Sequence, residues 1–171
     1  YGVIMYVNFI FLGVFIGYSI GSAPVISYHF GAENRAELRG LLRRSIGILA
    51  ALSVAMTALA EALALPLARL FVGYDAALLA MTRHGFMLYS LSFLFAGGGI
   101  FGSAFFTALN NGAVSALISF LRALVFQVAA VLILPQIMGL DGVWLAVPAA
   151  EALALAVAAA CFAVKRKQYG Y

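Results

Sequence analysis

The sequence predicts an all-α, polytopic membrane protein. Of its 171 residues, 65% are hydrophobic and only 9% are charged, whereas a soluble domain carries about a quarter charged residues. The mean hydropathy is +1.09. Such a chain lacks the polar side chains that would cover a surface in water, which excludes a soluble enzyme, a nucleic-acid-binding module and a disordered segment. At about 20 residues per crossing, there is room for five or six membrane helices.

The first two spans are predicted from an uncharged run and a capping signal. Residues 3–30 contain no Asp, Glu, Lys or Arg, and Pro24 inside this run predicts a kink. Asn34, with a glutamate three residues later, resembles a capping box, so the second helix should start there. It should cross the bilayer over residues 45–65 and stop at Pro66.

Turn signals separate the remaining apolar runs. Residues 67–84 contain several charges and form the predicted connection to the third span. An Asn-Asn-Gly turn follows at 110–112, Pro135 closes the next run, and Asp141 begins an Asp-Gly turn as a plausible N-cap. We therefore predict three further spans, at residues 85–109, 114–135 and 143–164.

The distribution of Lys and Arg predicts the orientation of the spans. The loop at 31–44 holds four of these residues and the C-terminal segment holds three, whereas the loop at 67–84 on the opposite side holds two. Because positive loops stay in the cytoplasm, the C-terminus should be cytoplasmic and Tyr1 should lie outside the plasma membrane. The net charge of +4 therefore reflects the orientation of the chain in the membrane, and no nucleic-acid partner is expected.

Small residues predict how the helices pack. They recur at four-residue intervals as Gly13, Gly17 and Gly21, as Gly98 and Gly102, and as Ala150, Ala154 and Ala158. Such stripes let helix backbones approach closely in lipid. Glycine and proline also permit bending in transporters. The hinge or gating candidates are Pro24, Gly97, Gly98, Gly99 and Pro148.

Signatures of catalysis and metal binding are absent from the sequence. It contains no Ser/His/Asp arrangement, no HExxH and no phosphate-binding GxxxxGK[ST] motif. The single cysteine, Cys161, lies among alanines, and the two histidines, His29 and His84, lie near predicted membrane boundaries. We therefore expect neither an enzyme nor a bound cofactor or metal.

Ionisable residues inside the spans are functional candidates, because charge at membrane depth is costly. Glu61 lies five residues before Pro66 and could simply face water. Arg122 lies roughly 12 Å from the cytoplasmic turn. Its side chain either extends back to that surface as an anchor or lines the transport pathway.

Glu151 is the ionisable candidate whose position in the membrane the sequence defines best. It follows Trp144, a predicted interfacial aromatic residue, by seven positions, which places its carboxyl group roughly 10 Å into the bilayer. This group either exchanges a proton for a cation, as an ion-coupled carrier requires, or makes a structural hydrogen bond to a neighbouring helix. Uncharged residues with polar, flexible or aromatic side chains could complete a pathway for organic cations. They are Met5, Asn8, Ser92, Phe93 and Gln127.

Three runs resemble the multidrug and toxic compound extrusion (MATE) transporters. They are GSAPVISYHFGAENRAELRGLLRRS at 21–45, FFTALNNGAVSALISFLRALVF at 105–126 and LPQIMGLDGVWLAVPAAE at 134–151. They follow the order of the later helices in that family. The resemblance implies a fold of twelve helices in two six-helix lobes, of which this chain would supply helices eight to twelve. The N-terminal lobe of the same transporter would then be a required partner, along with the lipid bilayer.

The resemblance also implies a function. MATE transporters export organic cations and drugs in exchange for H⁺ or Na⁺. Some members bind sodium through acids on helices seven and ten, but helix seven is missing and residues 85–109 contain no acid. We therefore expect a fragment of a secondary antiporter whose coupling ion stays open. The alternatives are a flippase for lipid-linked oligosaccharides in the same superfamily, and a truncated remnant that transports nothing.

Overall fold

The computed structural model describes residues 1–171 and contains helices but no strands. The elements are α1 (Gly2–Gly31), α2 (Arg35–Val72), α3 (Ala76–Ser90), α4 (Ser92–Ala108), α5 (Gly112–Phe120), η1 (Leu121–Phe126, a π-helix), α6 (Gln127–Met138) and α7 (Leu140–Tyr169). They form five rods, each long and apolar enough to cross a membrane. The predicted all-α fold with five spans is confirmed.

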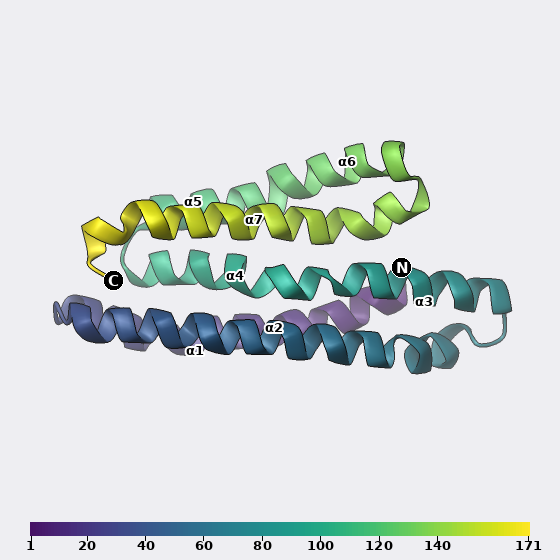
Figure 1. Ribbon diagram of the computed structural model, residues 1–171, viewed down its shortest axis with the longest axis horizontal. Helices are drawn as coiled ribbons and strands as arrows, with labels where there is room; N and C mark the ends of the chain where they lie inside the picture. Colours follow the sequence, from purple (N-terminus) through teal and green to yellow (C-terminus); the bar gives the residue numbers. More distant parts are fainter.

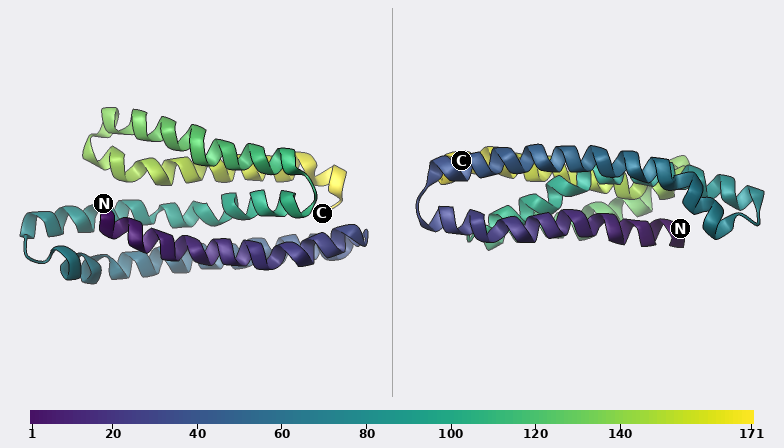
Figure 2. Two further views of the ribbon diagram at one scale, coloured as in Figure 1. Left: turned by 180° about the vertical axis from the view of Figure 1, so that it is seen from behind. Right: turned by 90° about the horizontal axis from the view of Figure 1, so that it is seen from below.

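The helix α4 is the centre of the bundle. The pair α1–α2 packs against one side of it, and α5 and α7 pack against the other (Figure 1). Views from behind and from below show all rods running along one direction (Figure 2). The arrangement therefore leaves the outer faces of α1, α2, α6 and α7 uncovered within this chain.

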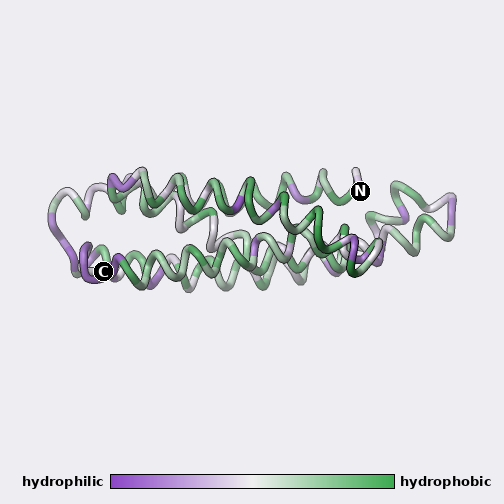
Figure 3. The backbone as a smooth tube through the Cα atoms, turned by 90° about the horizontal axis from the view of Figure 1, so that it is seen from above, coloured by the Kyte–Doolittle hydropathy of each residue, from purple (hydrophilic) through white to green (hydrophobic).

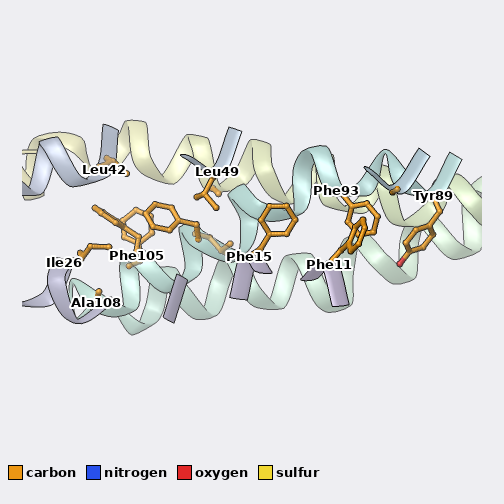
Figure 4. Packing of buried hydrophobic residues seen from close by; sticks show 14 of the residues in the cluster. Phe11, Phe15, Ile26, Leu42, Leu49, Tyr89, Phe93, Phe105 and Ala108 are labelled. Atoms are coloured by element: carbon orange, nitrogen blue, oxygen red, sulfur yellow. The ribbon is translucent and has the colours of Figure 1, made fainter. Parts of the chain in front are cut away.

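Aromatic side chains fill the space around α4. Phe11 of α1 packs on Phe93 with ring centres 5.0 Å apart, and Phe105 contacts Phe162 of α7 at 5.2 Å. Figure 4 shows this row of buried side chains between the helices. Large rings contribute much apolar contact per residue, which binds α1 and α7 to the central helix.

The second helix begins where predicted but ends later. The Asn34 side chain accepts a hydrogen bond from the backbone N–H of Glu37, which confirms the cap. The predicted stop at Pro66 is wrong, because α2 continues through this proline to Val72. A proline removes only one helical hydrogen bond, and membrane helices tolerate the loss. The predicted connection at 67–84 thus shrinks to residues 73–75.

The later boundaries differ in smaller ways. The third rod is interrupted at Leu91, between α3 and α4. The fourth continues through Pro135 to Met138. The next turn is made by Gly139, whose φ of 61° favours glycine, so Asp141 lies in the first turn of α7 instead of capping it.

Polar residues gather at the ends of the bundle, as the hydropathy colouring shows (Figure 3). Between the ends, large apolar side chains are exposed on the outside, including Ile20, Val54, Leu132 and Leu153. An apolar outer surface is costly in water but suits hydrocarbon. This surface agrees with a multi-pass membrane protein.

Two of the three small-residue stripes lie at helix contacts. An added Cβ at Gly98 would collide with Leu155, and one at Gly102 would lie 2.9 Å from the Cβ of Ala158. Ala154 and Ala158 are themselves buried. By contrast, an added Cβ at Gly13, Gly17 or Gly21 would meet nothing within 4 Å. The packing prediction is therefore confirmed for α4 and α7, whereas the α1 stripe lies on an open face.

Candidate functional site

Arg122 and Glu151 form an ion pair inside the bundle. Nε of Arg122 donates to Oε2 of Glu151 at 2.8 Å, and Nη2 donates to Oε1 at 2.8 Å. Glu151 is 7% exposed. This bidentate geometry is the strong form of a charge-assisted hydrogen bond. Pairing also lowers the cost of two charges at membrane depth, because the pair is neutral as a unit.

The pair bears on the two interpretations of Arg122, as an anchor or as part of the pathway. Its side chain extends toward α7, whereas an anchor would extend back toward the end of the helix. The structure therefore does not support the anchoring interpretation. The predicted hydrogen bond between Glu151 and a neighbouring helix is present, with Glu151 as the acceptor, and its role in transport stays a prediction.

The surroundings of Arg122 favour this geometry. Arg122 lies in η1, the π-helical turn between α5 and α6. Single π-turns inside α-helices occur frequently at functional sites. On the facing helix, a Cβ added to Gly99 would lie 3.3 Å from Cδ of Arg122. The missing side chain of Gly99 therefore leaves space for the arginine to lie against α4 on its way to Glu151.

A cavity of about 300 Å³ lies on the Glu151 side of the pair. Five predicted pathway residues line it: Met5, Asn8, Ser92, Gln127 and Glu151. They come from α1, α4, α6 and α7, so the fold brings together residues far apart in the sequence. Tyr89, which was not among the predicted pathway residues, also lines this cavity with its buried ring.

The cavity offers groups that suit a cation. The Ser92 hydroxyl is buried, and no protein group hydrogen-bonds to it. Residues with hydroxyl, amide and carboxylate groups therefore line one space: Ser92, Asn8, Gln127 and Glu151. The oxygens of such groups bind hard cations, and the ring of Tyr89 can attract organic ones.

A second hollow of about 200 Å³ lies on the Arg122 side of the pair. Ser103 of α4 and Ser119 of α5 line it, with their hydroxyl oxygens 2.7 Å apart. The network continues from Ser103 to Ser115 at 2.9 Å and from Ser115 to Thr107 at 2.7 Å. Hydroxyl groups thus extend from the arginine toward the α4–α5 turn.

The amino-acid sequence also matches a known protein family. A family model described as MatE matches residues 1–133, more than three quarters of the chain. The chain belongs to the MATE family. The family resemblance of the three sequence runs is thereby confirmed, and MATE proteins are membrane transporters.

Solved MATE structures share this fold. The chain superposes on the outward-facing conformation of a multidrug resistance MATE family transporter of the MOP superfamily with a TM-score of 0.86, at 20% identity. The TM-score is 0.88 at 16% identity for the Vibrio cholerae MATE transporter VcmN in the bent form. In both cases 99% of this chain is covered, but only 38% of the other. No curated protein matches the chain significantly by sequence.

Other candidates lie outside the two hollows of this MATE chain. Phe93 is 1% exposed and packs in the aromatic core. Among the hinge candidates, Gly97 faces Phe15, and Gly98 faces Leu155. Both glycines lie within the uninterrupted helix α4. Pro24 and Pro148 lie within α1 and α7.

Residues near the predicted outer ends make local contacts. Nε2 of His84 lies 2.9 Å from Oδ1 of Asp141, which joins α3 to α7. Trp144 is 5% exposed and stacks on Tyr1, so the predicted interfacial aromatic residue packs inside the bundle. Glu61 is exposed on α2, away from the ion pair. No three His, Cys, Asp or Glu side chains gather as a metal site.

Proposed function

We propose that the chain is the greater part of one lobe of a secondary antiporter that exports organic cations in exchange for H⁺ or Na⁺. The chain spans about 38% of the length of the solved transporters it matches, so a second lobe completes the protein. Substrates then cross between the lobes by alternating access. The chain lies in the cytoplasmic membrane as a multi-pass protein.

The observation that carries this proposal is the position of Glu151 between an arginine and a cavity. Its carboxylate binds Arg122 on one side and faces Asn8, Ser92 and Gln127 on the other. A proton, a sodium ion or a substrate cation entering the cavity competes with Arg122 for the same two oxygens. Such competition couples the binding of one cation to the release of another.

Alternating access is supported by the likeness to two conformations. The TM-score is 0.86 for an outward-facing MATE transporter and 0.85 for an inward-facing one, each at 20% identity. The same arrangement of five rods therefore fits both. A lobe that keeps its internal packing can move as a rigid body, which is the usual basis of alternating access.

The charges at the two ends support the proposed orientation. Arg35, Arg39, Arg43 and Arg44 lie near the start of α2, at the end of the bundle that also holds Lys165, Arg166 and Lys167. Only Arg69 and Arg83 lie near the opposite end. By the positive-inside rule, we propose that the α1–α2 turn and the C-terminal end of α7 are cytoplasmic.

The cavity favours a cation over a lipid-linked oligosaccharide as substrate. Binding a phosphate-bearing lipid would require free Arg or Lys side chains. The cavity beside Glu151 holds no such side chain, and Arg122 is engaged in the ion pair.

Dye efflux tests the role of Glu151 in the complete transporter. Glu151→Gln removes the charge but keeps the size of the side chain, so we expect efflux to fall at every pH between about pH 6 and pH 8. Glu61→Gln is the matched control, because it makes the same change on an exposed face of α2. Efflux that Glu151→Gln leaves unchanged over this pH range would refute the proposed coupling.

A further inference from the structure

A groove runs along the outside of the bundle between α2 and α7. These two helices each pack on α4 more than on each other, so α4 forms the floor of the space between them. One part of the groove, of about 390 Å³, has nearly only apolar walls, which include Leu49, Ala50, Leu155 and Ala159. A second part, of about 380 Å³, adjoins it and shares Ile46 and Phe162 with it.

Three arginines surround the second part. Arg39 and Arg43 come from α2, and Arg166 comes from α7. No acidic residue lies within ion-pair distance of any of them. Arg39 donates one hydrogen bond to the carbonyl of Gly170 at 3.2 Å, whereas Arg43 and Arg166 have no side-chain hydrogen bond. The mouth of the groove therefore presents uncompensated positive charge with free N–H donors.

The dimensions fit one leaflet of a bilayer. From Arg43 to Ser53, which lines the deep part, α2 rises by about 15 Å. The hydrocarbon core of a bilayer is about 30 Å thick, so one leaflet contributes about 15 Å. A phosphate held by the arginines would thus place an acyl chain along the apolar walls.

We propose that this groove binds an anionic phospholipid, with its phosphate at Arg39, Arg43 and Arg166 and an acyl chain between α2 and α7. Basic pockets between membrane helices on the cytoplasmic side are suited to acidic headgroups. The inference rests on the proposed orientation, which places the arginines at the anionic inner leaflet. The lipid would fix the spacing of α2 and α7, which pack on α4 more than on each other.

Lipid binding to the complete transporter tests this assignment. In native mass spectrometry from detergent, phosphatidylglycerol should bind more tightly than phosphatidylcholine with the same acyl chains. The triple variant Arg39→Gln/Arg43→Gln/Arg166→Gln should lose this preference, by roughly 100-fold if each arginine contributes as membrane-surface cations usually do. Ala50→Trp should weaken the binding of both lipids, because the ring fills the apolar part.

A matched control separates the groove from net charge. Arg44→Gln/Lys165→Gln/Lys167→Gln removes three charges from the same end without altering the lining of the groove, so the lipid preference should persist. If both triple variants lost the preference for phosphatidylglycerol, or if neither did, the proposed lipid site would be refuted. If inorganic phosphate displaced the bound lipid as effectively as free phosphatidylglycerol does, the groove would be a site for anions in general and not for a phospholipid. Since binding and not transport is measured, failure here is distinct from failure of the antiporter proposal.

Discussion

Arg122 and Glu151 are 29 residues apart in the sequence, yet they meet through two hydrogen bonds of 2.8 Å. A buried ion pair contributes little net stability relative to apolar residues, because both charges lose their hydration. Removing one partner is different, since the other charge stays buried alone. The pair therefore affects stability and transport in separable ways.

Single and double substitutions distinguish these effects. We expect Arg122→Met to lower the free energy of unfolding of the complete transporter by about 3–5 kcal/mol, because Glu151 is left unpaired. The double variant Arg122→Met/Glu151→Leu should regain most of this loss. Thermal unfolding in detergent measures the stabilities, and dye efflux measures activity in the same preparations.

The decisive comparison is between the stability and the dye efflux of the double variant. A stable protein without efflux would assign the pair to transport. A stable protein with full efflux would reduce it to a packing contact and contradict the proposed mechanism.

The residues of the cavity were largely foreseeable, but their partners were not. Polar and ionisable side chains inside apolar spans are conspicuous, which brought attention to Asn8, Gln127 and Glu151. Their meeting depends on the rotation of each helix about its axis, and Arg122 lies in a π-helical turn that no proline or glycine signals. Tyr89 was missed because a tyrosine near a helix end is ordinary in membrane proteins.

At the scale of the elements, the close contact between α4 and α7 depends on glycine and alanine, whose side chains are absent or small. Gly102 lies against Ala158, where an added Cβ would be only 2.9 Å from the alanine Cβ. Dispersion contacts between closely spaced backbones drive helix association in lipid, where the hydrophobic effect gives no driving force. Larger residues at this contact would push α7, which carries Glu151, away from α4.

Substitution at Gly102 tests this packing. We expect Gly102→Ala to destabilise the complete transporter by about 1–3 kcal/mol, because neither backbone can move without disturbing its neighbours. Gly47→Ala on α2, where a Cβ meets nothing within 4 Å, should be neutral or stabilising by up to about 1 kcal/mol through helix propensity. Thermal unfolding midpoints compare the two, and equal midpoints would contradict a tight α4–α7 contact.

Element boundaries show why some sequence signals are stronger than others. Asn34 caps α2 as predicted, because a side-chain acceptor at a helix start satisfies a backbone donor in any environment. Pro66 and Pro135 do not end their helices. In lipid an unpaired backbone is costlier than in water, so a membrane helix continues through a proline that a soluble helix would avoid.

At the scale of the whole molecule, one face of the bundle has no partner. Gly13, Gly17 and Gly21 of α1 present a smooth strip with open space beside it. Small-residue strips are typical of helix contacts in membranes. The strip is therefore open to contact by the second lobe of the proposed transporter.

A chain limited to residues 1–171 should therefore transport nothing. Reconstituted in liposomes, we expect it to show the helical circular dichroism of a folded bundle but no dye efflux above empty liposomes, because alternating access needs two lobes. The complete transporter serves as the positive control. Efflux by residues 1–171 alone would contradict the two-lobe proposal.

The order of synthesis gives the ion pair a further consequence. A ribosome delivers Arg122 to the membrane before Glu151 exists, so the arginine must first enter the bilayer without its partner. The segment Gly112–Met138 is the most apolar of the five spans, and its apolar residues offset an arginine's insertion cost of about 2.5–3.5 kcal/mol. The apolar residues around Arg122 would thus favour insertion of this span before α7 supplies the carboxylate that pairs with the arginine.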